Sequence, residues 1–212
     1  MQFENYFESI PEIIKTLFTN PEKPWETLEN LDTFIKKNTR AKMEGIRVGE
    51  VYIDHDVWIG KGTVIEHGAM IKGPAIIGKN CEIRAGAYIR GNVFIDDACV
   101  IGHSTEIKSS IVMRNSNCGH FNYVGDSILG SGVNLGAGSV LANLRFDKKT
   151  IIVGQEDTGR AKLGSILGDG CQIGCNTVLN PGTIFEKHIR YAGRPLKAGF
   201  YRQEDVRKFF KA

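Results

Sequence analysis

An aliphatic residue recurs at every sixth position over most of this 212-residue chain. The first unbroken run is Ile53, Ile59, Ile65, Ile71, Ile77, Ile83, Ile89, Ile95, Ile101 and Ile107. After single dropped positions the repeat continues through Val112, Cys118, Val124, Leu129, Leu135 and Leu141, then through Leu167, Ile173, Leu179 and Phe185. So short a fixed period predicts a solenoid, in which each unit packs only on its neighbours.

Each six-residue unit is interpreted as one short strand followed by one corner. Three units, about 18 residues, close a triangular coil, and successive coils stack about 4.8 Å apart as paired strands. Small residues four positions after each aliphatic one also point inward, which makes Cys81, Cys99 and Cys171 inert core residues. Glycine, with 25 residues, suits the corners. We therefore predict an all-β fold, a left-handed parallel β-helix, over residues 43–197.

The two ends and one internal segment fall outside the repeat. Residues 1–42 show helical spacing of apolar residues in 5–18 and 24–38, and we expect them to form a helical cap over the open first coil. Residues 198–212 predict a short C-terminal helix or arm. Residues 144–164 interrupt the repeat and are expected to protrude as a loop, with basic residues at Lys148, Lys149, Arg160 and Lys162.

Composition excludes several functions. The net charge of +3 is too mild to favour binding to nucleic acid or to a membrane surface. No apolar run approaches the roughly 20 residues of a membrane span. The first residues lack the basic region of a secretory signal, so we expect a cytoplasmic protein.

The repeat register places chemically capable residues along one corner. His67, His103 and His120 occupy equivalent positions and share a column with Ala85, Ala137 and Cys175. Glu106 and Tyr123 form a second column just past the corner, with Lys108 and Arg84 nearby. An imidazole beside a carboxylate can accept a proton near neutral pH, and the two cations suit a phosphate. The alternative is that these are ordinary polar residues on an exposed corner.

A zinc site is a further alternative, but it is not favoured. β-Helix enzymes that bind zinc through histidines resemble the γ-carbonic anhydrases and show an H-x4-H spacing, which this sequence lacks. We expect no metal.

Residues 106–151 carry a more specific pattern. They read EIK, then H-x-x-Y-x-G-D beginning at His120, then N-x-G-A-G beginning at Asn134, and finally Ala142-Asn143. This run resembles the acetyltransferase domain of the bifunctional N-acetylglucosamine-1-phosphate uridyltransferase/glucosamine-1-phosphate acetyltransferases, which belong to the hexapeptide-repeat acyltransferases. The wording "ANLRFD" is closer to archaeal sugar-phosphate nucleotidylyltransferases with the same β-helix.

The resemblance implies a role for each matching residue. His120 would be the general base and Glu106 would orient it. The sugar phosphate would be held by Arg84, Lys108, Tyr123, Asn134, Asn143 and one loop lysine, Lys149 or Lys148. Ala137, Cys175 and Ala192 would line the pantetheine arm of acetyl-CoA. Leu144, where the family has an aromatic residue, and most of the 144–164 segment depart from the bacterial pattern.

The implied activity is acetyl transfer from acetyl-CoA to an amino-sugar phosphate such as glucosamine 1-phosphate. The roughly 40 residues before the repeat are too few for a nucleotide-binding domain, so we expect no uridyltransferase activity. We also expect a homotrimer with sites between subunits and the 144–164 loop reaching a neighbour. Two alternatives remain: an acceptor that is a nucleotide-linked amino sugar, or a non-catalytic assembly or regulatory subunit of a separate sugar nucleotidyltransferase.

Overall fold

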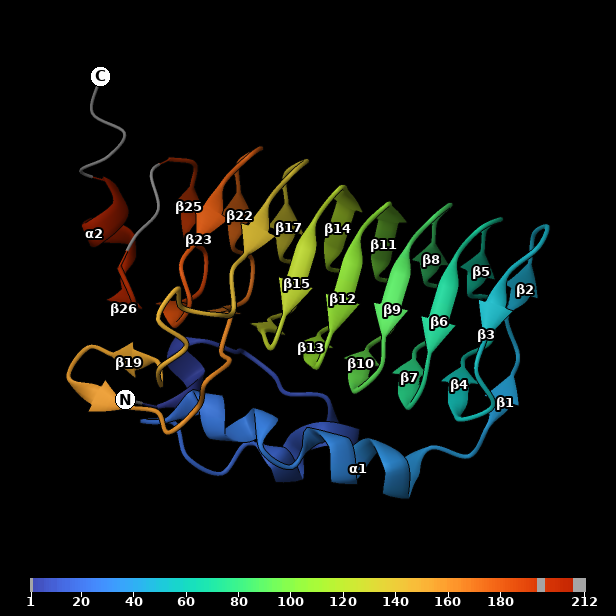
Figure 1. The fold of residues 1–212 in the computed structure, drawn as a ribbon, viewed down its shortest axis with the longest axis horizontal. Helices are drawn as coiled ribbons and strands as arrows, with labels where there is room; N and C mark the ends of the chain where they lie inside the picture. The colour runs from blue at the N-terminus through green and yellow to red at the C-terminus, as the bar shows by residue number, and fades with distance from the viewer. Residues whose placement is uncertain (1, 194–196, 208–212) are drawn as a thin grey trace.

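The computed structural model describes residues 2–193 and 197–207, and in them the chain forms a β-solenoid of about nine turns. Three parallel sheets make its sides (Figure 1). The all-β, parallel β-helix prediction is confirmed. Of the predicted C-terminal arm, residues 208–212 lie outside the described residues. Within the described ranges, no helix combines the length and apolar character needed to cross a bilayer.

Strand order follows the coils: from β1 to β18 every third strand joins the same sheet, and the count then shifts because the insert contributes β19 and β20. Sheet 1 contains β1 (Lys42–Met43), β4 (Val57–Ile59), β7 (Ala75–Ile77), β10 (Val93–Ile95), β13 (Ser110–Val112), β16 (Ile128–Leu129), β21 (Ser165–Leu167), β24 (Thr183–Phe185) and β26 (Gly199–Tyr201). Sheet 2 contains β2 (Ile46–Arg47), β5 (Val64–Ile65), β8 (Glu82–Ile83), β11 (Val100–His103), β14 (Asn117–His120), β17 (Asn134–Leu135), β22 (Gln172–Ile173) and β25 (Arg190–Tyr191). Sheet 3 contains β3 (Tyr52–Ile53), β6 (Met70–Lys72), β9 (Tyr88–Arg90), β12 (Glu106–Lys108), β15 (Tyr123–Gly125), β18 (Val140–Leu141) and β23 (Val178–Leu179).

The inward column of aliphatic residues forms the core of the solenoid. Strand pairing aligns Ile77, Ile95, Val112, Leu129, Leu167 and Phe185 down sheet 1, as the period predicts. All of these are fully buried. Cys81, Cys99, Cys118 and Cys171 are buried free thiols, whereas Cys175 is exposed. The structural interpretation of the inward cysteines is therefore confirmed.

Small inward residues also close the corners. The Thr63 hydroxyl donates to the Gly78 carbonyl at 2.7 Å, and the Ser116 hydroxyl donates to the Gly130 carbonyl at 2.7 Å. At the same place in their own coils, Cys81 and Cys99 donate through sulfur to carbonyls 3.1 Å away. A hydroxyl or a thiol can fill this position because either one satisfies a buried carbonyl that the corner leaves without a strand partner.

We expected the N-terminal segment to cover the first coil, but this prediction is wrong. The segment consists of 3₁₀ helices at Phe3–Asn5, Glu12–Leu17 and Pro24–Leu28 followed by α1 (Leu31–Asn38), and it runs along the outer face of sheet 1 (Figure 1). Its buried side chains pack on an apolar row that points outward from that sheet, including Phe94 and Ile111. The chain begins at the C-terminal coils, where the Asp169 backbone N–H donates to the Tyr6 carbonyl at 2.7 Å.

The inserted segment 144–164 folds back on its own chain. It contains an antiparallel hairpin of β19 (Ile152–Val153) and β20 (Glu156–Asp157), and Leu144 bridges Lys162. Ile151, Val153 and Leu163 are buried in the same cluster as the N-terminal segment. A short helix, α2 (Gln203–Arg207), follows the last strand. The insert is therefore anchored by apolar burial on sheet 1, and its exposed residues include the tips around Phe146 and Gly154 and the returning residues Gly159, Ala161 and Lys162.

Candidate functional site

The histidine column predicted from the repeat is present at the corner between sheets 2 and 3. His103 of β11 pairs directly with His120 of β14. The next coil places Ala137 above His120, with the Gly138 N–H donating to the His120 carbonyl at 3.0 Å. Cys175 stands one coil further, next to the Asn176 N–H that donates to the Ala137 carbonyl at 2.8 Å. Because the side chains of Ala137 and Cys175 are short, the corner above His120 projects less than it does at the histidines.

His120 differs from the other two histidines in what its ring contacts. The His103 Nδ1 lies 2.7 Å from the Ala85 carbonyl, which can only accept, and its Nε2 lies 3.3 Å from the Ser104 hydroxyl. The His67 Nδ1 accepts the Glu50 N–H at 3.3 Å. Among the residues the structure describes, none hydrogen-bonds to the exposed imidazole of His120. Its two nitrogens are available to a ligand.

The backbone around His120 is held from below. Asn122, which is 2% exposed, accepts the His120 backbone N–H at 3.2 Å and donates to the Gly136 carbonyl at 2.7 Å. Phe121 sits at the corner itself with φ +53°, an uncommon conformation for a bulky residue. Its ring is exposed and lies 5.3 Å from that of His103 and 6.5 Å from that of His120. Strand pairing and Asn122 thus fix a conformation that the sequence alone disfavours.

Glu106 lies on the neighbouring strand and aligns with Tyr123, as the register predicts. Its carboxylate accepts a hydrogen bond from the Arg90 guanidinium at 2.7 Å. The structure shows no contact between Glu106 and His120. The resemblance implies that Glu106 orients the imidazole, but no contact in this structure supports that role.

Arg84 and Asn134 lie on the sheet 2 side of the corner. Arg84 binds the Glu82 carboxylate through two nitrogens, at 2.7 and 3.0 Å. Asn134 is exposed on β17, between Asn117 and Gln172 in neighbouring strands. The structure does not bring either residue to Lys108, with which the resemblance groups them.

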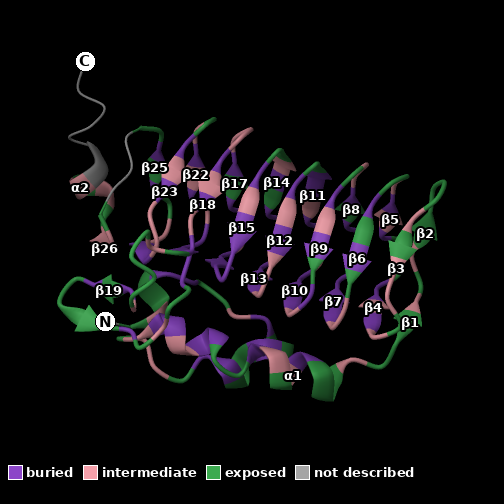
Figure 2. Ribbon diagram, in the orientation of Figure 1, coloured by how far each residue is buried: buried purple, intermediate pink, exposed green. Residues whose placement is uncertain are grey.

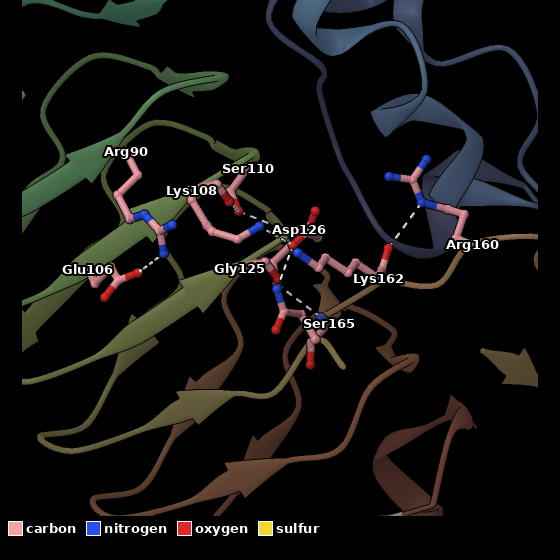
Figure 3. Close-up of polar contacts among 11 residues, drawn as sticks. Arg90, Glu106, Lys108, Ser110, Gly125, Asp126, Arg160, Lys162 and Ser165 are labelled. Atoms are coloured by element: carbon pink, nitrogen blue, oxygen red, sulfur yellow. Dashed lines mark hydrogen bonds and ion pairs between the residues drawn. The ribbon is translucent and has the colours of Figure 1, made fainter. Parts of the chain in front are cut away.

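Lys108, Tyr123 and Asn143 do meet, around a residue that sequence analysis did not single out. One carboxylate oxygen of Asp126 accepts a hydrogen bond from the Lys108 ammonium at 2.6 Å (Figure 3). The same oxygen accepts one from the Asn143 side-chain amide at 2.5 Å. Asp126 is 7% exposed. Burial is the main cause that raises the pKa of Tyr123, while a hydrogen bond with Asn143 opposes it. We call these four residues the Asp126 cluster.

The candidate residues thus form two groups rather than one. His120, with Ala137 and Cys175 above it, lies at the corner where sheet 2 turns into sheet 3. The Asp126 cluster lies at the other end of sheet 3. The strand β15 between them spans about 10 Å at about 3.3 Å per residue. The motif H-x-x-Y-x-G-D already contained Asp126, and the missed signal was that its carboxylate directly follows strand β15.

The remaining predicted residues fall in different places. Lys148 and Lys149 are both exposed, and the Lys149 backbone N–H donates to Asp147 at 3.2 Å. Ala192 is exposed and lines a surface cleft of about 490 Å³ together with Gly174 and Tyr191. In the described ranges, no three His, Cys, Asp or Glu side chains gather as a metal site requires.

The repeat, the histidine corner and the EIK…H-x-x-Y-x-G-D run together define a hexapeptide-repeat β-helix protein of the transferase type. A family model described as the GMPPB C-terminal domain matches residues 71–192, more than half of the chain, and the chain belongs to this family. The resemblance to the acetyltransferase region of GlmU proteins is also confirmed.

Individual relatives agree with this assignment. "Bifunctional protein GlmU" of Methanococcus maripaludis (strain C7) is 46% identical over 162 residues, which are 75% of this chain and 39% of that protein. "Uncharacterized acetyltransferase YaiX" of Escherichia coli O6:K15:H31 is 33% identical over 193 residues, 84% of each chain. The chain spans about two fifths of the length of the GlmU relatives.

The solved structures that are similar to this chain include a perosamine N-acetyltransferase variant from Caulobacter crescentus in complex with CoA and GDP-perosamine. It is 14% identical with a TM-score of 0.35, over 71% of this chain and 55% of that one.

Proposed function

We propose that this protein transfers the acetyl group of acetyl-CoA to the amino group of an amino-sugar phosphate such as glucosamine 1-phosphate, with His120 as general base. The observation that carries the proposal is that no residue in the described part of the chain hydrogen-bonds to the His120 imidazole, in a column where His67 and His103 have ring nitrogens engaged. The acetyltransferase named among the relatives supports the reaction class.

The chemistry requires an unprotonated amine. As the amine nitrogen attacks the thioester carbonyl, a neutral imidazole at His120 takes its proton, and a tetrahedral oxyanion forms. Collapse breaks the carbon–sulfur bond, and the imidazolium returns the proton to the leaving thiolate of CoA. Such a positioned base accelerates a reaction by about 100- to 10,000-fold. The oxyanion would need a hydrogen-bond donor, most simply a backbone N–H group.

Acetyl-CoA would lie along the low part of the corner above His120. Ala137 and Cys175 carry short side chains there, and Ala192 borders the adjoining cleft. A long, thin pantetheine arm fits a groove of this kind, because larger side chains at any of these positions would block it.

The acceptor would reach the Asp126 cluster, which offers an ammonium, an amide and a phenol. Because β15 separates this cluster from His120 of the same chain, a homotrimer would join the His120 corner of one copy to the Asp126 cluster of the next. Both groups would then flank one substrate, in keeping with the symmetric assembly expected from the sequence.

The test uses two histidines that are neighbours in the column. His120→Ala should lower thiol release from acetyl-CoA with glucosamine 1-phosphate by about 100-fold or more. His103→Ala, the matched control, should stay within about twofold, because the ring of His103 already contacts the Ala85 carbonyl of the preceding coil and the Ser104 hydroxyl.

Equal activity of the two variants would remove His120 from the mechanism. Turnover only with a nucleotide-linked amino sugar would move the acceptor to that class. Lack of turnover with every amino sugar, together with no acetyl-CoA binding by calorimetry, would favour an assembly subunit.

A further inference from the structure

The inserted segment returns to the β-helix directly beside the Asp126 cluster. The Gly164 N–H donates to the Asp126 carbonyl at 2.8 Å, and the Leu163 N–H donates to the Asn143 carbonyl at 3.0 Å. Gly164 fits here because a Cβ would come within 2.2 Å of the Gly125 carbonyl oxygen. The position of this returning limb is therefore set by main-chain contacts with the cluster, and Lys162 sits at its start.

Charges around the cluster are not balanced. Lys108 is neutralised by Asp126, and Arg90 is paired with Glu106. Lys162 extends its side chain toward Asp126 (Figure 3), and no carboxylate in the described part of the chain forms an ion pair with it. The Arg160 guanidinium donates to the Lys162 carbonyl at 3.3 Å and likewise has no described acidic partner. The excess positive charge at this place comes from the insert.

An anion at the cluster would need that excess. Lys108 alone offers little net attraction, because Asp126 lies 2.6 Å from its ammonium and would repel a phosphate. A second ammonium restores a net positive charge beside the amide of Asn143. Two cations arranged around one carboxylate can still present N–H donors outward to a phosphoryl group.

We propose that Lys162 of the inserted segment binds the phosphoryl group of the acceptor, and that Asp126 is a positioning residue that holds Lys108 and Asn143 beside it. This inference rests on the proposed function for the identity of the acceptor. Lys162 takes the place of the loop lysine that the resemblance implied. Lys149 lies on the first part of the inserted segment, where its backbone N–H donates to Asp147, and it has no described contact with the Asp126 cluster.

The test measures binding apart from catalysis. Glucosamine 1-phosphate is titrated by calorimetry into the intact protein, into Lys162→Gln and into Lys162→Arg. Loss of one charge-assisted contact should weaken binding by about tenfold or more in Lys162→Gln, whereas Lys162→Arg should retain most of it. Lys61→Gln, an exposed lysine on an early corner, is the control with unchanged affinity. Circular dichroism and the melting temperature confirm that each variant is folded.

Kinetics then separate a phosphate contact from a structural effect. In Lys162→Gln the KM for glucosamine 1-phosphate should rise with little change in kcat or in the KM for acetyl-CoA, and activity on glucosamine, which has no phosphate, should not change.

Unaltered affinity in Lys162→Gln, or a loss seen in Lys149→Gln instead, overturns the proposal. If the intact protein binds the sugar phosphate through Lys162 but releases no thiol, the proposed acetyl transfer fails and the phosphate site stands. Absence of binding by the intact protein rejects the phosphate site itself.

Discussion

Sheet 1 and sheet 3 are built from the same repeat, yet their outer surfaces are opposites. The residue before each inward aliphatic one points outward in both sheets. In the sheet 1 strands from β7 to β24 these residues are Ile76, Phe94, Ile111, Ile128, Ile166 and Ile184, none more than 4% exposed. In sheet 3 they are Tyr52, Met70, Tyr88, Glu106, Tyr123, Val140 and Val178, all at least partly exposed (Figure 2).

The difference shows how a repetitive fold gains distinct faces. The inward aliphatic residues are alike on all three sides of the prism. They therefore do not determine which outer face is covered by other segments. An apolar outer row recruits the N-terminal segment and the insert, because each buried apolar side chain gains about 1.5–3 kcal/mol from leaving water. The mixed outer row of sheet 3 stays partly exposed, and the candidate site residues lie on it or beside it.

The largest expected effect comes from truncating the covered row. Phe94→Ala should lower the free energy of unfolding by about 3–5 kcal/mol, since it leaves a cavity between β10 and the N-terminal segment. Met70→Ala, on the corresponding row of sheet 3, should cost less than about 1 kcal/mol, because Met70 is 38% exposed. Urea unfolding followed by circular dichroism measures both. Equal losses would mean that the N-terminal segment does not shield sheet 1.

Ion pairs give the next largest contrast, because the two pairs of sheet 3 differ in burial. In the pair of Lys108 with Asp126, the side chains are 14% and 9% exposed, and in the pair of Arg90 with Glu106 they are 44% and 31% exposed. Asp126→Asn strands the Lys108 ammonium in a nearly buried place and should cost about 2–3 kcal/mol. Glu106→Gln, the matched control, should cost between about 0 and 1 kcal/mol.

The same urea titrations decide this prediction. If the two variants unfold at the same urea concentration, Asp126 is not the centre of a buried cluster.

Sequence periodicity predicted the fold because the six-residue spacing leaves one arrangement that buries every aliphatic residue. It also predicted the column of His103 and His120, since partners in adjacent coils are about 18 residues apart. The location of the N-terminal segment could not be derived from its own helical pattern, which shows that a face is buried but not against what. The apolar row of Ile76, Phe94 and their equivalents was the signal that could have placed it.

The candidate site was predicted as a set of residues but not as a geometry. Register assigns Glu106 and Lys108 to columns, but each had more than one partner within reach. Side-chain packing chose Arg90 for Glu106 and Asp126 for Lys108. The contacts of Lys162 depend on how a 21-residue insert folds back, and the insert breaks the period on which the prediction relied.

The smallest expected effect on stability, and the sharpest test of the corner, concerns the cysteines. Cys175→Ser should change the free energy of unfolding by less than about 0.5 kcal/mol, because the side chain is exposed. In the native protein near pH 8, iodoacetamide should modify Cys175 and leave Cys118 and Cys171 intact, as burial raises the pKa of each of these two thiols to about 12. Mass spectrometry after proteolysis assigns the sites, and urea-unfolded protein, labelled at all five cysteines, is the control.

If acetyl-CoA lies above His120, saturating acetyl-CoA should slow the modification of Cys175 several-fold. An unchanged rate would place the cofactor elsewhere and leave the low corner above His120 without its proposed ligand.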